Sequence, residues 1–294
     1  MAKSVTPFLD AMRTAVSIKK TETILPIVRK TVYITPLVVG DDLSLRTALI
    51  SPVGYDRELI KLLVNHLEIK DQPSPININE LSSNISNIDK LSMIWALLKS
   101  TYENFAENEE VTCECGHKMT INIDVSELLH EDTYTIWDKV DKEDNIIPFN
   151  QYVYPIQIVK DDIIYTFQTK LPSMMDNNNL LNLVPIDQIQ YNLENIKSLF
   201  DQTLNLGLLT KSIKIESKTK SFEPVTTDNL NEILLSLKQF IPKSIGSEFL
   251  KKYEEHFDKY VPKFYKTFKC LKCEKENKHF VDLENSLFRK SLLD

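Results

Sequence analysis

Cys113-Glu-Cys115-Gly-His117 and Cys270-Leu-Lys-Cys273 contain all four cysteines of this chain and lie toward opposite ends of it. Each pair follows a helix-like segment and a short strand-like approach, and each precedes a second strand with an acidic, amphipathic exit. Two close thiol pairs on two β-turns are typical of a zinc ribbon, in which the turns face one another across one tetrahedral metal ion. Each turn aims two sulfur atoms in the same direction and so supplies half of a four-sulfur site. The sequence therefore predicts a structural Zn²⁺ bound by Cys113, Cys115, Cys270 and Cys273.

The spacing of the cysteines leaves other interpretations open. Cys113 and Cys115 are one residue closer than in the usual Cys-x-x-Cys turn, so His117 is a candidate substitute ligand for Cys113 as well as an ordinary solvated turn histidine. Roughly 155 residues separate the two pairs, against about 15–20 in a usual ribbon, so one shared metal would join two distant halves of the chain. Four inert, half-buried thiols would give the same pattern. Disulfides within each pair are the third interpretation, and the lack of a secretion signal argues against them.

Composition argues against several other classes of protein. Hydrophobic residues make up 42% of the chain and charged residues 26%, as in an ordinary soluble protein. There are 5 glycines and no G-x-G-x-x-G or G-x-x-x-x-G-K-[ST] motif, so a phosphate-binding loop is not expected. The net charge of −7 disfavours a nucleic-acid partner, which clustered lysine and arginine would bind. No apolar run approaches the ~20 residues that span a bilayer, and no signal peptide is recognisable. We expect a protein made in the cytoplasm, with no membrane span.

A weak internal duplication is the second pattern in the sequence. The segment Val153–Asp162 echoes Val32–Asp42, and Thr169–Ser173 echoes Ala48–Pro52. Each half then runs through helices to a cysteine pair, a strand and a short helix. We therefore predict an α+β fold with two pseudo-repeated, helix-rich α+β halves joined by a zinc-ribbon-like four-cysteine site. A pseudo-dyad between the halves would bring the two cysteine pairs together.

The predicted domain boundaries follow from this duplication. They are an N-terminal arm at 1–27, a first α+β repeat with its cysteine pair at 28–130, an acidic surface connection at 131–150, and a second α+β repeat with its cysteine pair at 151–294. The arm can belong to the core or dock on a partner. The clearest helix is expected at 88–104, where apolar residues trace one stripe. A hairpin is expected from 153–159 and 162–169, and further helices at 186–206, 227–240 and 246–260.

No catalytic motif is recognisable, so we expect neither enzymatic activity nor a small-molecule substrate. The chain has no G-x-S-x-G and no H-E-x-x-H. The recurring carboxylate pairs, Asp41-Asp42 and Asp161-Asp162, are adjacent residues whose side chains diverge, and they are interpreted as turn and cap residues. A zinc ion with four thiolate ligands has no open position for water.

Three stretches of the sequence resemble a known family. VYITPLVVGDDLSLRTALISPVGYD (Val32–Asp56), IDKLSMIWALLKSTY (Ile88–Tyr102) and the cysteine pair that follows look like the T-even-type bacteriophage base plate proteins, which are hub subunits or hub assembly factors of contractile tails. The resemblance covers residues 28–130 and, less fully, the cysteine-bearing C-terminal part. It implies a role in building the baseplate hub, other tail proteins as partners, no enzymatic activity, and a metal site at the four cysteines. It also implies a location in the host cytoplasm during assembly and in the tail baseplate of the virion.

Two alternatives remain at this point. A zinc-ribbon accessory factor that binds nucleic acid would use a run of lysines around the second cysteine pair, although Glu274 and Glu276 interrupt that run and the whole chain is acidic. The lysines are Lys263, Lys266, Lys269, Lys272, Lys275 and Lys278. A metalloenzyme that uses His117 with an incomplete set of thiolates is the second alternative.

Overall fold

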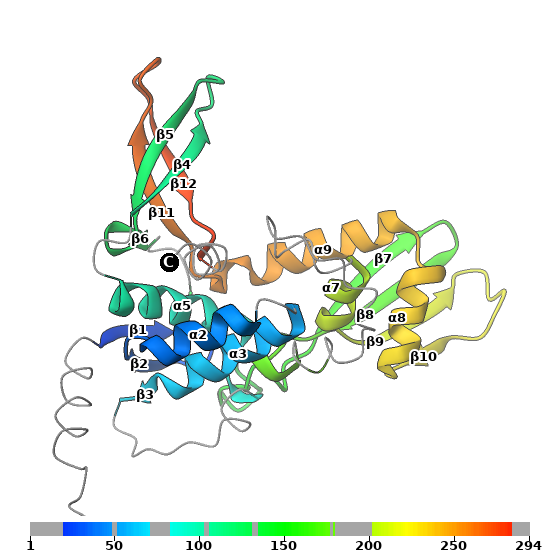
Figure 1. Cartoon of the computed structure of the whole chain (residues 1–294). Coiled ribbons are helices and arrows are strands. Elements are labelled where there is room, and N and C mark those ends of the chain that lie inside the picture. Colours follow the sequence, from blue (N-terminus) through cyan, green and yellow to red (C-terminus); the bar gives the residue numbers. More distant parts are fainter. Residues whose placement is uncertain are drawn as a thin grey trace, which may run out of the picture.

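The computed structural model of the chain describes residues 20–48, 52–70, 83–102, 106–130, 135–176, 179 and 202–283. In this part of the chain, helices accompany strands that form four antiparallel sheets. The predicted α+β class is therefore confirmed. Figure 1 shows two bodies beside one another and a pair of β-hairpins that projects from them.

The first body is a three-stranded sheet in the order β1-β2-β3. Its strands are β1 (Thr21–Leu25), β2 (Lys30–Ile34) and β3 (Leu67–Ile69). Between β2 and β3 the chain forms helices α2 (Val39–Ala48) and α3 (Pro52–Asn65), and the chain then continues to α5 (Asn87–Thr101), which packs against β1 and β2.

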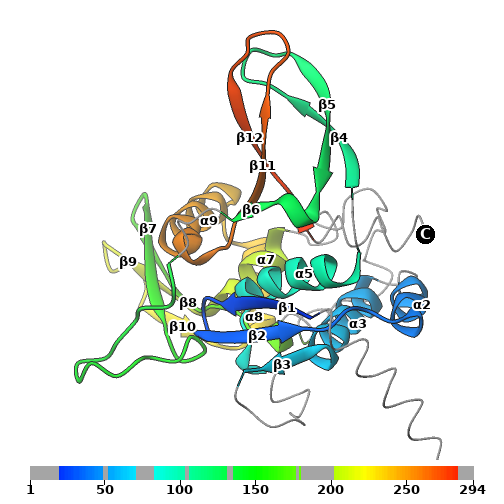
Figure 2. The same ribbon diagram turned by 90° about the vertical axis from the view of Figure 1, so that its left-hand side faces the viewer.

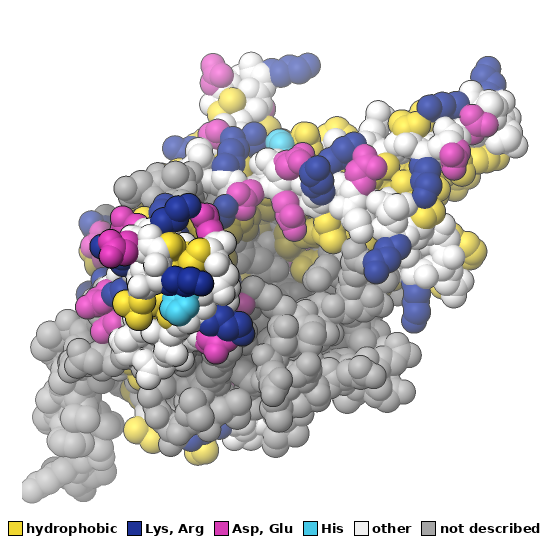
Figure 3. Space-filling model, turned by 90° about the horizontal axis from the view of Figure 1, so that it is seen from above, with side chains coloured by type: hydrophobic (Ala, Val, Ile, Leu, Met, Phe, Trp, Pro, Cys, Tyr) yellow, Lys and Arg dark blue, Asp and Glu magenta, His cyan; other side chains and the backbone are white. Residues whose placement is uncertain are grey.

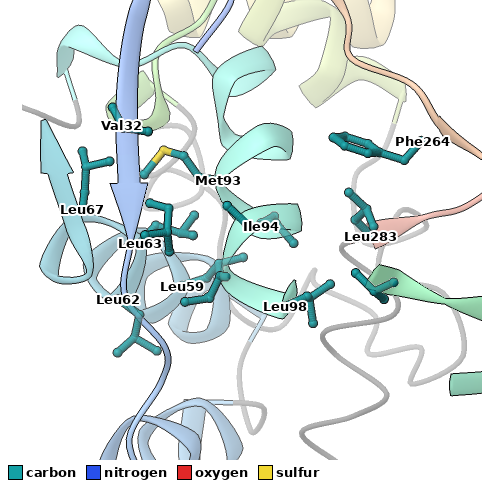
Figure 4. Close-up of a cluster of buried hydrophobic side chains, with 14 of the residues drawn as sticks. Val32, Leu59, Leu62, Leu63, Leu67, Met93, Ile94, Leu98, Phe264 and Leu283 are labelled. Carbon is teal, nitrogen blue, oxygen red and sulfur yellow. The ribbon is translucent and has the colours of Figure 1, made fainter. Parts of the chain in front are cut away.

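Helix α5 is the centre of the first hydrophobic core. Ser86 begins it with a capping box: the Ser86 hydroxyl accepts from the backbone N–H of Ile88, and the Asp89 carboxylate accepts from that of Ser86. Met93 and Ile94 are fully buried. Figure 4 shows that one side of α5 faces Val32 and the leucines of α3, while the other faces Phe264 and Leu283 from the C-terminal part of the chain. The predicted helix at 88–104 is thus confirmed, and it contacts both ends of the sequence.

The second body is a four-stranded meander in the order β10-β9-β8-β7, with helices packed against it. Its elements are β7 (Tyr154–Lys160), β8 (Ile163–Thr169), α7 (Gln202–Leu209), β9 (Thr210–Ser217), β10 (Val225–Thr227), α8 (Leu230–Gln239), α9 (Lys243–Phe257) and the short 3₁₀ helix η4 (Asp258–Tyr260). The ring centroids of Phe249 on α9 and Phe167 on β8 are 4.7 Å apart, in a second buried core. The predicted β7–β8 hairpin is confirmed.

Two hairpins form the projecting arm. One consists of β4 (Ala106–Thr112) and β5 (Lys118–Asp124); the other consists of β11 (Phe264–Lys269) and β12 (Glu276–Phe280). After β5, the 3₁₀ helix η1 (Val125–Glu127) leads to β6 (Leu129–His130), which pairs with β11. The hairpins therefore share a base, and Figure 2 shows them rising side by side to tips far from the helices.

The predicted duplication is not confirmed. Asp41 and Asp42 lie within helix α2, where the Asp41 carboxylate accepts from the backbone N–H of Val38. Asp161 and Asp162 instead form the tight turn between β7 and β8, and Asp161 has a φ of 54°. Aspartate is favoured at helix starts and in left-handed turns for different reasons. The same Asp-Asp pair is therefore found in a helix in one half and in a β-turn in the other. The two cysteine hairpins do correspond, one in each half.

The structure also refines the predicted boundaries. Strand β1 lies within the segment 1–27 that was assigned to an arm, so that boundary falls inside the β1–β2 hairpin; residues 1–19 lie outside the described part. In the connection 131–150, the described residues 135–150 include Trp137 and Phe149, which are buried in the second core. Residues 135–150 are therefore anchored in the second core through these two side chains, whereas the sequence predicted a surface connection. Of the helix expected at 186–206, only residues from 202 onward are described, in α7.

Among the helices of the described residues, none combines the length and the apolar character that crossing a bilayer requires.

Candidate metal centre

The four cysteines meet at the tips of the two hairpins. Cys113 and Cys115 lie in the turn between β4 and β5, and Cys270 and Cys273 lie in the turn between β11 and β12. All four Sγ atoms lie within 4.8 Å of one another. The structure therefore brings together the complete set of residues that the sequence predicts as metal ligands.

The sulfur spacing fits a tetrahedral metal ion. Zn–S bonds of about 2.3 Å place the corners of a four-sulfur tetrahedron about 3.8 Å apart. The Cys115 and Cys270 sulfurs are separated by 3.8 Å, and the Cys113 and Cys273 sulfurs by 3.5 Å. Both of these pairs join one hairpin to the other. All four cysteines are free thiols, and these separations are far longer than the S–S bond of about 2.05 Å in a disulfide.

Each turn is closed by backbone hydrogen bonds that orient its two sulfurs. In the first turn, Gly116 N–H donates to the Cys113 carbonyl at 2.8 Å, and Cys113 N–H donates to the His117 carbonyl at 2.9 Å. Gly116 has a φ of +80°, a left-handed conformation that glycine adopts without steric cost. This tight closure allows a turn with only one residue between its cysteines to present both sulfurs.

The second turn is one residue longer and closes in a similar way. Glu274 N–H donates to the Cys270 carbonyl, and Cys270 N–H donates to the Lys275 carbonyl, each at 2.9 Å. Glu274 takes the left-handed position with a φ of 57°. The two turns thus reach equivalent geometry with different spacings.

The electrostatic environment favours a bound cation. The backbone N–H groups of Cys273 and Lys272 lower the pKa of the Cys270 thiol to about 6. For Cys273 the Lys275 N–H acts in the same direction, but desolvation and the neighbouring sulfurs outweigh it and raise the pKa to about 12. One thiolate therefore opposes the ionisation of its neighbour. A divalent cation attracts all four thiolates and would remove this opposition.

His117 and His279 have different positions. His117 is half-buried beside the first turn and is not part of the four-sulfur cluster. His279 Nε2 lies 2.7 Å from Glu109 Oε2, which connects β12 to β4. His279 is partly buried, and its carboxylate partner lies 170 residues away and leaves no local signal in the sequence.

Further polar contacts join the hairpins around the cysteines. Asn277 Oδ1 lies 3.5 Å from Cys113 Sγ, and Lys275 forms a longer ion pair, of 3.7 Å, with Glu114. Near the base, Lys266 pairs with Glu127. Cys113 and Cys270 are buried, whereas Cys115 is exposed. Seen from above, basic and acidic side chains are interspersed at this end of the molecule (Figure 3).

Comparison of the chain with protein-family models, with curated proteins and with solved structures finds no match.

Proposed function

We propose that this chain is a non-catalytic structural or assembly component of the baseplate hub of a contractile-tailed bacteriophage, with one structural Zn²⁺ held by Cys113, Cys115, Cys270 and Cys273. The observation that carries the proposal is the convergence of four thiols from two turns, 155 and 160 positions apart, at the tips of one projecting arm. The base of the arm is packed into the first core through Val111, Ile121 and Ile123, and its cysteine-bearing tips project from the two bodies (Figure 2), as a component that contacts neighbouring subunits requires.

The donor set favours zinc. Four thiolates at tetrahedral spacing select zinc or an iron–sulfur cluster over hard cations, and two facing turns are the arrangement of a zinc ribbon. The ion would also provide stability that the hairpins lack, since β4 and β5 form a separate two-stranded sheet and such hairpins are marginally stable alone.

Two observations support a non-catalytic role in the baseplate. Four thiolates complete the coordination shell of zinc, so a water molecule could not reach the metal. The baseplate assignment is supported by the resemblance of residues 28–130 to hub proteins of T-even-type phages. Under this proposal the partners are other tail proteins, first in the host cytoplasm and then in the tail baseplate.

The charges around the second turn favour this proposal over a nucleic-acid factor. Four of the six lysines there contact carboxylates: Lys263 with Asp258, Lys266 with Glu127, Lys269 with Glu274, and Lys275 with Glu114. Lys278 lies over the Tyr265 ring. Since phosphate binding needs uncompensated cations, these pairs weaken the basic surface that such a factor would use.

The test combines metal analysis with co-purification. We expect purified protein to contain stoichiometric zinc, C115S to lose most of it, and E114S, at the exposed position between the two cysteines, to retain it. The wild-type protein co-expressed with the tail proteins of a contractile phage should form a stable complex with at least one of them. Absence of zinc from the wild type would refute the metal assignment, and absence of any complex would refute the baseplate assignment. A salt-dependent shift of DNA or RNA would favour the nucleic-acid alternative.

A further inference from the structure

A cavity of about 550 Å³ lies where the two hydrophobic cores meet. One wall is the turn between β1 and β2, with Ile27 and Val28; another is the segment 146–150. Buried apolar side chains form the floor: Leu25, Leu67, Ile85, Trp137 and Phe149. The size is within the range of about 300–1,000 Å³ found for ligand sites.

The walls of this cavity are held in place by hydrogen bonds. Trp137 N–H donates to the Pro26 carbonyl at 2.8 Å, and Trp137 Nε1 donates to the Ile147 carbonyl at 2.7 Å. Ile27 N–H donates to the buried Asp89 carboxylate at 2.8 Å. One tryptophan therefore connects both walls, and helix α5 fixes the turn. A rigid, preformed site loses less conformational entropy when a ligand binds.

The rim is cationic and polar. Arg29 and Lys30 line the cavity, both are exposed, and neither forms an ion pair with a carboxylate of the described residues. Arg29 has a left-handed φ of 57°, closed by a 2.8 Å hydrogen bond from its N–H to the Leu25 carbonyl. Asn84 and Asn150 provide exposed amide groups, and Ile146, 49% exposed, extends the apolar lining outward.

We propose that this cavity is a docking site for a segment of a partner protein that inserts apolar side chains and carries carboxylates beside them. The apolar floor accepts the inserted side chains, while Arg29 and Lys30 are complementary to the carboxylates. The exposed amides at the rim can bond to peptide N–H and C=O groups, and the outward extension at Ile146 suits an extended chain better than a small enclosed ligand. The inference rests on the proposed role in protein binding, but it depends on neither the zinc ion nor the phage assignment.

Trp137 provides a direct measurement of binding. The chain has 2 tryptophans, so the full-length W95F variant leaves Trp137 as the single tryptophan, which can be excited selectively over the tyrosines. The probe is a short acetylated peptide in which Leu, Ile and Phe alternate with Glu. We expect a saturable change in Trp137 fluorescence, and at least about tenfold weaker binding when Ser replaces the apolar residues or Lys replaces Glu.

Charge reversal in the same background tests the rim. R29E/K30E should weaken binding of the acidic probe by about tenfold or more, whereas K211E/K218E, a matched reversal of exposed lysines on the second body, should change it by less than about twofold. Thermal melts would verify that both variants fold. No saturable signal with the peptide, equal losses in the two variants, or binding of decanoate in its place would overturn the proposal. Such a result would leave zinc content and tail-protein complexes unaffected, so the two proposals fail separately.

Discussion

Cys113 Sγ lies 3.5 Å from Cys273 Sγ, although 160 positions separate the two residues. The contact joins hairpins that belong to different parts of the sequence, and the β6–β11 pairing joins the same hairpins at their base. The arm is thus complete only when the C-terminal hairpin has reached the first one. A metal ion that binds both tips would stabilise this closed arrangement over all states in which the hairpins are apart.

Removal of the metal with a chelator is expected to loosen the tips and leave the two bodies folded. Each body has its own buried core, whereas β4 and β5 form a separate two-stranded sheet whose side chains in the first core are Val111, Ile121 and Ile123. Amide hydrogen exchange should therefore become faster by at least about tenfold in β4, β5 and β12 and remain unchanged in α5 and β8. A uniform loss of protection through the whole chain would show that the metal supports the entire fold.

Replacement of Gly116 by alanine should weaken metal binding through the backbone alone. A Cβ at Gly116 would contact nothing within 4 Å, but the φ of +80° is unfavourable for alanine by roughly 1–2 kcal/mol. G40A is the matched control because Gly40 also has open space around it and lies in α2, where alanine is favoured over glycine. A competition titration with a zinc-binding dye should show about fivefold to thirtyfold weaker zinc affinity for G116A and no change for G40A. Equal affinities would contradict the strain argument.

Much of the fold could be predicted from local sequence patterns. The apolar stripe on α5 and the Lys-Asp-Asp turn of the β7–β8 hairpin both depend on neighbouring residues, and both are present. The position of β9 could not be predicted in the same way. Its residues alternate between polar and apolar side chains, which indicates a strand with one exposed face, but it lies inside the sheet between β8 and β10, where Ile213 is buried. Alternation identifies a strand but does not identify its neighbours.

The candidate site shows the same division between local and distant information. Closely spaced cysteines are a local sequence pattern, so the four candidate ligands could be predicted from their spacing and residue type. The Glu109–His279 contact and the cavity beside Arg29 depend on segments that meet only in the folded chain. The internal resemblance between the halves was misleading for a related reason, because aspartate serves helix starts and turns equally well.

The pair formed by Glu109 and His279 is expected to stabilise the closed arm. Both side chains are partly buried, at 21% and 25% exposure, so solvent screens their 2.7 Å contact less than it screens the exposed Lys118–Glu110 pair. A double-mutant cycle with E109Q and H279A, measured by denaturant unfolding, should give a coupling free energy of about 0.5–1.5 kcal/mol. The cycle with E110Q and K118A serves as the control and should give a clearly smaller coupling, because both of its side chains are exposed. Similar coupling free energies in the two cycles would mean that partial burial does not strengthen the Glu109–His279 interaction.

Asp89 is expected to make stability fall as pH rises. Its side chain is fully buried, and desolvation raises its pKa to about 7 although the N–H groups of Ile27, Ser86 and Val28 stabilise the carboxylate. An unfolded chain would ionise this group near pH 3.9. The stabilising contribution of the neutral acid is therefore complete below about pH 4, declines between about pH 4 and 7, and is lost above that range, a difference on the order of 4 kcal/mol.

Unfolding free energies of the wild type and D89N, measured between pH 4 and 8, would test this directly. The asparagine does not titrate, so the difference between the two profiles should shrink or reverse in favour of D89N as pH rises, even though the amide loses one acceptor for the Ser86 N–H. D176N provides the control of opposite sign, because desolvation of Asp176 is outweighed by contacts with Lys170 and Ser173 that lower its pKa. The stability that Asp176 contributes should be present above the unfolded pKa and lost as pH falls through the folded pKa. Parallel profiles for the wild type and D89N would show that Asp89 is ionised throughout this range, with its backbone donors outweighing burial.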